Sequence, residues 1–268
     1  MRLTTIVKPF QAGNILIMPF TNIEDIKEPR IIINDVEAIP ENAVKHDARV
    51  DIMDPNTRKR CFLVEHVLGP LRLVGITNAK VSGVDKVWNF LRPEHRFAYS
   101  LGLGPEFVVG EEDGTQRPGL EALVNQMSDY VVKTKCKVYK SVAREVIYEN
   151  IDPFGYKGRI VISPRNPGEG ITLNVRLFKN SLENLLITED GLQDKELLKR
   201  ILRARTPYLI GLEAEEALHH AVGDVVADIV GLGGLTDVAV SVELNFFYHA
   251  LTVGAIKKAQ FVKEVEEC

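Results

Sequence analysis

The chain has few cysteines, little net charge and no long apolar segment. Its three cysteines, Cys61, Cys136 and Cys268, have neither the paired spacing of a zinc–cysteine site nor a disulfide framework, so we expect reduced thiols. The net charge of -4 is spread without a basic stripe, which argues against nucleic acid as a partner. No apolar run approaches the ~20 residues of a membrane span, and the first residues have a strand pattern rather than that of a signal peptide. We therefore expect a soluble protein of the cytoplasm.

The length of 268 residues suffices for two domains, each with its own core. We place the boundary at Ser128, which gives an N-terminal domain of residues 1–128 and a C-terminal domain of residues 129–268. Alternating apolar residues predict strands at 3–7, 14–18, 30–33, 49–53, 79–81, 131–138, 141–148, 158–163, 172–177 and 237–243. Helical periodicity predicts helices around His66, at 119–127, 192–203 and 213–229, and from His249 to about residue 264. Each half is thus predicted to be an α+β unit.

Two segments of the chain resemble each other. VEHVLGPLRLVGITNAKV starts at Val64, and LHHAVGDVVADIVGLGGLTDVAVSV starts at Leu218. In each copy a histidine is followed three residues later by glycine, then by an apolar run, a further glycine and Thr-Asn or Thr-Asp. Both copies predict a helix, a turn and a strand. If the two halves pack face to face, the two histidine helices meet at their interface.

These two helices carry residues suited to a catalytic zinc ion. Residues four apart on a helix lie on one face with Cβ atoms ~6 Å apart, so His220 and Asp224 can bind one metal ion. His66 can supply a third ligand, which leaves the fourth tetrahedral position for water, and Glu65 beside it could act as base toward that water. The His₂Asp set suits Zn²⁺ and also accepts Fe²⁺. The pattern is typical of a metal-dependent hydrolase.

A structural interpretation of each histidine stands beside the metal hypothesis. A buried histidine on an apolar helix is more often a core residue than a ligand. Several histidines and carboxylates on two such helices are harder to explain as core residues, because buried charge is costly unless it is paired or metal-bound. His219 lies ~100° around the helix from His220, so we expect it to face solvent or the rim of the site. We also expect His46 and His95 at the surface.

Four short motifs occur along the chain in a fixed order. They are Val64-Glu65-His66-Val67-Leu68, Arg203-Ala204-Arg205-Thr206, His220 with Asp224 and Asp228, and Tyr248-His249-Ala250-Leu251. In this order they resemble the motifs of the zinc-dependent UDP-3-O-acyl-N-acetylglucosamine deacetylases of lipid A biosynthesis. The similarity runs from about residue 44 to 81 in the first half and from 197 to 259 in the second.

The resemblance implies a fold and a metal site. The fold would be two similar two-layer α/β sandwiches packed face to face, with the active site between them. His66, His220 and Asp224 match the zinc ligands of that family, and Glu65 matches its general base. A zinc ion acidifies water toward a pKa of ~7 and polarises an amide carbonyl, while the carboxylate takes the proton.

Three further residues receive roles only through the resemblance. His249 matches the histidine that stabilises the oxyanion or protonates the leaving amine. Asp228 matches a carboxylate that orients this histidine, which keeps the imidazole charged and aimed. Thr206 matches a threonine near the scissile carbonyl.

The chain departs from this family where the acyl chain binds. Only thirteen residues separate Thr206 from His220, whereas the family enzymes have a long insert there that forms the acyl tunnel. Pro207 and Ala221 replace a phenylalanine and a lysine of the family motifs. We therefore expect a deacetylase for a smaller N-acetylated amino sugar or sugar nucleotide. Two alternatives stay open: deacetylation of the acylated glucosamine itself, and a non-catalytic binding relative of the same fold.

Overall fold

Three β-sheets and four α-helices make up the part of the chain that the computed structural model describes. This part comprises residues 1–12, 15–20, 26–46, 49–83, 129–152, 154–204 and 214–265. The predicted helix at 119–127, together with His95 and Thr206, lies outside these residues. The mixed α and β content agrees with the α+β class expected from the sequence.

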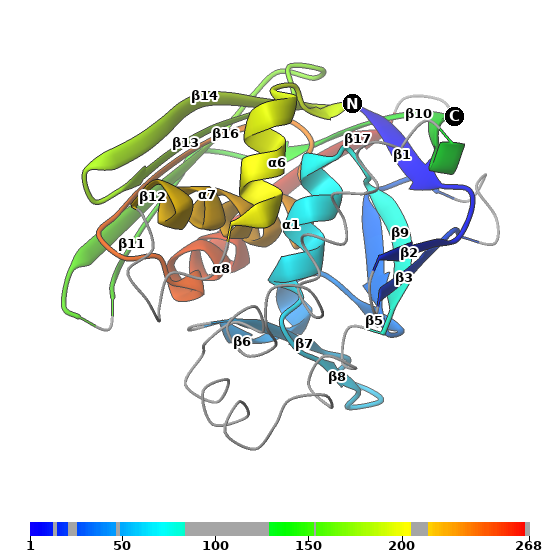
Figure 1. Ribbon diagram of the computed structural model, residues 1–268, viewed down its shortest axis with the longest axis horizontal. Coiled ribbons are helices and arrows are strands. Elements are labelled where there is room, and N and C mark those ends of the chain that lie inside the picture. The colour runs from blue at the N-terminus through cyan, green and yellow to red at the C-terminus, as the bar shows by residue number, and fades with distance from the viewer. Residues whose placement is uncertain are drawn as a thin grey trace.

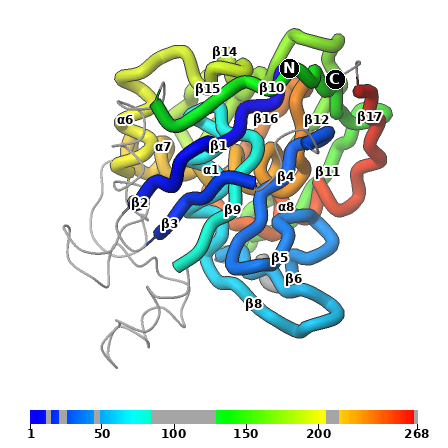
Figure 2. Tube along the Cα trace, turned by 90° about the vertical axis from the view of Figure 1, so that its right-hand side faces the viewer, coloured from blue at the N-terminus to red at the C-terminus, as the bar shows by residue number. Residues whose placement is uncertain are grey.

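The largest sheet has eight strands and joins both halves of the chain. Strand β10 pairs with β1 in antiparallel fashion, and β17 pairs with the other edge of β10. Figure 2 shows β10 (green) beside β1 (blue). Strand β1 lies before residue 128 and β10 lies after it, so this sheet contains strands of both predicted domains. Two separate sandwiches are therefore not confirmed, and the domain division stays a prediction. The strands are β1 (Arg2–Ile6), β2 (Phe10–Ala12), β3 (Ile15–Met18), β4 (Arg30–Ile33), β5 (Val36–Glu37), β9 (Asn78–Ser82), β10 (Val131–Val142) and β17 (Phe261–Val265).

The second sheet has six strands in the order β11-β12-β16-β13-β14-β15. All neighbours are antiparallel except β13 and β16, which run parallel. The break expected between strands 131–138 and 141–148 was wrong, because β10 continues to Val142 and the chain turns only at residues 143–145. The strands are β11 (Val146–Ile151), β12 (Lys157–Pro164), β13 (Ile171–Leu177), β14 (Asn180–Thr188), β15 (Gly191–Leu192) and β16 (Val238–Leu244).

Helices fill the space between the two large sheets (Figure 1). Helices α7 and α8 cover one face of the six-stranded sheet, and α6 packs on α7. Helix α1 packs against α7 and η3 and is buried along its whole length. The elements are α1 (Glu65–Leu73), α6 (Lys195–Arg203), α7 (Ala214–Val225), its π-helical continuation η3 (Val226–Gly231) and α8 (His249–Lys258). Within the described ranges, no helix has the length and apolar character needed to cross a bilayer.

A small third sheet lies next to the beginning of α1. It consists of β6 (Ala43–His46), β7 (Val50–Met53) and β8 (Arg60–Cys61), with β7 in the middle. The short 3₁₀ helix η1 (Pro40–Asn42) precedes β6. The amide of Val64 donates to the carbonyl of Val50 at 3.1 Å, which fixes this sheet to the start of α1. Leu63, the residue before, has a φ of +54°, a conformation that a branched side chain rarely adopts.

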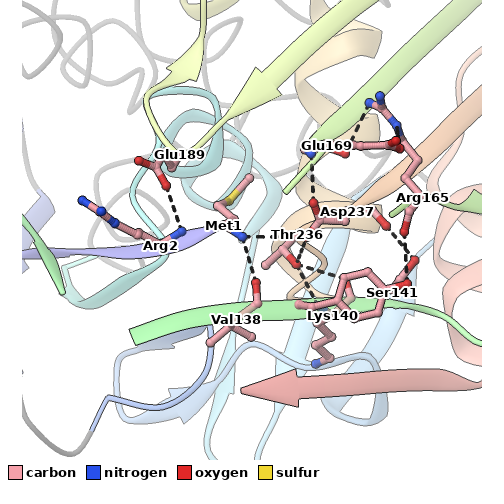
Figure 3. A network of polar contacts seen from close by, with 12 residues as sticks. Met1, Arg2, Val138, Lys140, Ser141, Arg165, Glu169, Glu189, Thr236 and Asp237 are labelled. Carbon is pink, nitrogen blue, oxygen red and sulfur yellow. Dashed lines mark hydrogen bonds and ion pairs between the residues drawn. The ribbon is translucent and has the colours of Figure 1, made fainter. Parts of the chain in front are cut away.

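A buried polar network connects the two large sheets (Figure 3). Asp237 is fully buried and accepts hydrogen bonds from the amide of Gly170 at 2.9 Å and from the hydroxyl of Thr236 at 2.7 Å. The amide of Lys140, in β10, donates to the same Thr236 hydroxyl oxygen at 2.7 Å. The network therefore links the eight-stranded sheet to the loop that enters β16.

Two of the three cysteines lie in described strands. Cys61 is a buried cysteine outside any disulfide, and its Sγ lies 3.2 Å from the carbonyl oxygen of Ile33. Cys136 is disulfide-bonded, so the expectation of reduced thiols is wrong for this residue. The spacing of three cysteines along the sequence carried no signal for that bond.

Candidate metal centre

Helices α1 and α7 touch backbone to backbone where they cross. A Cβ atom placed on Gly69 would lie 2.3 Å from the carbonyl oxygen of Gly223, so α1 has no room for a side chain at this position. His66 and His220 each lie three residues before one of these glycines, on the same face of the helix. Their rings consequently meet edge to face, with centroids 5.8 Å apart and planes at 83°. The two His-x-x-Gly copies of the sequence thus bring their histidines together at the crossing.

A buried group of His66, His220 and Asp224 lies at this crossing. One ligand atom from each residue lies within 4.8 Å of the other two, and Nε2 of His220 is 3.0 Å from Oδ2 of Asp224. Two ligands of one tetrahedral zinc ion, at ~2.0–2.2 Å from the metal, lie about 3.4 Å from each other. Small side-chain movements would bring the three residues to these distances. The group could therefore hold a metal ion.

The second ring nitrogen of His220 supports this fit. Nδ1 lies 3.3 Å from the carbonyl oxygen of Ala204, the residue that follows α6. A carbonyl accepts but cannot donate, so the proton of a neutral ring is held at Nδ1 and Nε2 presents its lone pair toward Asp224. Such a backbone partner at the far nitrogen is usual for metal-binding histidines.

Glu65 lies in the first turn of α1, beside this group. One carboxylate oxygen accepts a hydrogen bond from the amide of Val50 at 3.0 Å, and the other lies 3.9 Å from Nε2 of His66. Burial raises the pKa of Glu65 to about 8, with a further contribution from Asp224 and an opposing one from His249. A carboxylate with this pKa exchanges a proton near neutral pH, as a general base must.

His249, the first residue of α8, lies beside Asp224 of this group. Its Nδ1 donates to Oδ2 of Asp228 at 2.7 Å, and its Nε2 lies 3.9 Å from Oδ2 of Asp224. Burial alone would lower the pKa of His249, but the carboxylates of Asp228, Asp224 and Glu65 together raise it to about 9. The imidazole is therefore a cation at neutral pH, and its Nε2 is directed at Asp224.

The π-helical turn η3 determines where Asp228 points. In an α-helix each four-residue step turns the side chain ~40° around the axis, so a residue eight positions after His220 would drift away from its face. The amide of Leu232 instead bonds to the carbonyl of Ala227, five residues earlier, at 2.9 Å. A π-helical turn winds less per residue than an α-helix, so η3, which starts at Val226, reduces this drift at Asp228.

Other residues differ from what the sequence suggested. His219 is buried, with 5% of its surface exposed, rather than facing solvent, and its Nε2 lies 3.9 Å from Glu215. Sequence reasoning missed Val50, whose amide holds Glu65, because no local pattern relates β7 to α1. It also missed Thr252, whose hydroxyl donates to Asp228 at 2.5 Å, although its place one turn after His249 was a usable signal.

Comparison of the sequence with protein-family models and with curated proteins gave no match. The four motifs therefore remain a resemblance, and a function has to be argued from the geometry of the site. That geometry places six of the seven expected site residues together: His66, His220, Asp224, Glu65, His249 and Asp228. The seventh, Thr206, lies outside the described residues.

Proposed function

We propose that the chain is a metal-dependent amidohydrolase that removes the acetyl group of an N-acetylated amino sugar or sugar nucleotide. One observation carries this proposal: a buried His₂Asp group has both a carboxylate of raised pKa and a cationic histidine beside it. Amide hydrolysis needs these parts, because a water must lose a proton and the leaving amine must gain one. A Zn²⁺ ion held by His66, His220 and Asp224 would supply Lewis acidity toward the amide carbonyl, and Fe²⁺ is the second candidate.

Glu65 is the proposed general base. The Val50 amide holds one of its oxygens, which leaves the other on the side of His66. In its ionised form this carboxylate accepts the proton of the attacking water. The transfer leaves Glu65 as a neutral carboxylic acid. Burial favours this form, because it penalises the charged carboxylate.

His249 is the proposed acid. Its Nδ1 proton is held by Asp228, so Nε2 carries the proton that can move. The cation first stabilises the negative charge that develops on the carbonyl oxygen, and then donates the Nε2 proton to the leaving amine. A raised pKa keeps His249 protonated until that transfer.

The substrate class follows from the sequence. The thirteen residues between Thr206 and His220 are too few to form an acyl tunnel, so we propose an unacylated amino sugar, free or linked to a nucleotide. Amine release from N-acetyl sugars with and without UDP and 3-O-acyl chains tests this choice. A missing acyl site predicts no gain in kcat/KM from the chain. A large gain would instead support the acylated substrate.

Two variants and a matched control test the mechanism. Glu65→Gln should retain about one zinc per chain but lose turnover, whereas His220→Gln should lose the metal itself. His219→Gln is the control, because His219 lies next to His220 on α7, is equally buried, and is not in the ligand group. Metal content is measured by atomic emission, and turnover is measured by amine release. An active Glu65→Gln variant, or a His220→Gln variant that kept its zinc, would contradict the mechanism. Metal without turnover on any substrate would favour a binding role, and a wild-type protein without metal would overturn the ligand assignment.

A further inference from the structure

Thr252 lies one helical turn after His249 on α8 and reaches the same carboxylate. Its hydroxyl lies 2.5 Å from Oδ2 of Asp228, the oxygen that also accepts the Nδ1 proton of His249 at 2.7 Å. All three side chains are buried, with Thr252 and Asp228 fully so. Asp228 is thus held by two donors from a single face of α8.

The Thr252 hydroxyl has only one proton and two acceptors within reach. The carbonyl oxygen of His249 lies 3.1 Å away, whereas the carboxylate oxygen of Asp228 lies 2.5 Å away. The carboxylate is also charged and is therefore the stronger acceptor of the two. Oδ1 of Asp228 is buried and has no hydrogen-bond partner in the described part of the chain. Both donors therefore act on the same oxygen, and they set the rotation of the carboxylate.

Carboxylates rotate readily about their terminal torsion, because its energy profile is broad. A single bond from His249 would follow such a rotation, whereas a second donor at a fixed place on the helix resists it. We infer that Thr252 is a positioning residue: it fixes Oδ2 of Asp228 opposite Nδ1 of His249 and so keeps Nε2 of His249 directed at Asp224. Its effect on turnover rests on the proposed function, while its effect on the imidazole does not.

The kinetic test compares Thr252→Val, which has nearly the same shape but no hydroxyl, with Thr252→Ser, which keeps the hydroxyl. We expect kcat of Thr252→Val to fall about tenfold, with unchanged KM and metal content, since loss of an orienting partner typically costs ~10–100-fold. Thr252→Ser should restore kcat to within about twofold of the wild type. Thr5→Val is the control: it removes another fully buried hydroxyl, in β1, and should leave kcat unchanged.

The second readout needs no substrate. In zinc-loaded protein with ¹⁵N-labelled histidine, the Nδ1 proton of His249 should give a downfield resonance that exchanges slowly in the wild type and in Thr252→Ser. We expect this resonance to broaden or vanish in Thr252→Val, because the carboxylate no longer holds one orientation. An unchanged resonance together with unchanged kcat would overturn the inference. If the wild type turns over no substrate, the proposed function fails, and the resonance alone decides the role of Thr252.

Discussion

The contact between Gly69 and Gly223 makes Gly69→Ala the most direct test of how the site is assembled. The new Cβ atom would lie 2.3 Å from the Gly223 carbonyl oxygen and 3.4 Å from Cβ of Ala227. The first of these partners is backbone, so no side-chain rotation relieves it. Because ordinary contact begins near 3.4 Å, α1 and α7 must move about 1 Å apart.

Two opposing terms set the cost of this substitution. Overpacking of a filled core costs ~1–3 kcal/mol, and more when backbone has to move. Alanine favours the helix over glycine by ~0.5–1 kcal/mol, which offsets part of that loss. We therefore expect the free energy of unfolding to fall by about 1–2 kcal/mol. The larger effect falls on metal binding, since His66 and His220 lie one turn from the contact and metal–ligand distances tolerate only ~0.2 Å. We expect the zinc affinity to fall about 10–100-fold.

Urea unfolding of the metal-free protein and competition with a zinc chelator measure the two effects separately. Gly158→Ala, in β12, is the matched control: its Cβ would lie 2.7 Å from Cδ2 of Leu244 and 3.2 Å from Cδ2 of Leu251, both ends of flexible side chains. This variant should lose some stability and keep the wild-type zinc affinity. Equal zinc affinities in both variants would refute the argument that the helix crossing sets the ligand geometry.

Glu65→Gln should remove a pH dependence of stability in metal-free protein. Burial raises the pKa of Glu65 from 4.5 to about 8 in the folded protein. Protonation of Glu65 therefore stabilises the fold fully below pH 4.5. This stabilisation is lost as the pH rises from 4.5 to about 8, by up to ~1.4 kcal/mol per pH unit. Urea unfolding in EDTA should therefore find Glu65→Gln more stable than the wild type at pH 9 but not at pH 4.5, and parallel pH profiles would contradict this. Asp237→Asn should lower the free energy of unfolding by about 1–3 kcal/mol, because an amide nitrogen would replace an acceptor in its network with Thr236 or Gly170. Its zinc affinity should stay unchanged, and a loss there would tie the network to the site.

The ligand group could be predicted because its pattern is local. The spacing of His220 and Asp224 fixes their common face once the segment is helical, and the second His-x-x-Gly copy indicates its partner. The helix predicted at 192–203 was nearly right for a similar reason. It starts at Lys195 because Asp194 caps it, accepting from the amides of Glu196 and Leu197.

The errors come from interactions between distant segments. The last helix was predicted to run to about residue 264, yet residues 261–265 form β17, because β10 offers an open edge for pairing. Strand β14 was not predicted, because its pairing with β13 is irregular. The register shifts between Leu173 and Val175 of β13, and Asn184 of β14 has a φ of +57°. Such an irregularity breaks the alternation on which strand prediction depends. Pairing of β10 with β1 likewise could not be read from either half alone.

The charges of the site favour the metal hypothesis over a purely structural cluster. Glu65, Asp224 and Asp228 are all buried, and buried carboxylates need a compensating charge. His249 compensates Asp228, and in the metal-free chain burial raises the pKa of Glu65 to about 8 and so reduces its charge at neutral pH. Asp224 lies 3.0 Å from Nε2 of His220 and 3.9 Å from Nε2 of His249, and Nδ1 of His220 faces a backbone carbonyl that a neutral ring satisfies. A dication held by Asp224, His66 and His220 would balance this carboxylate without a second protonated imidazole, and it would account for the glycine crossing that brings the two rings together.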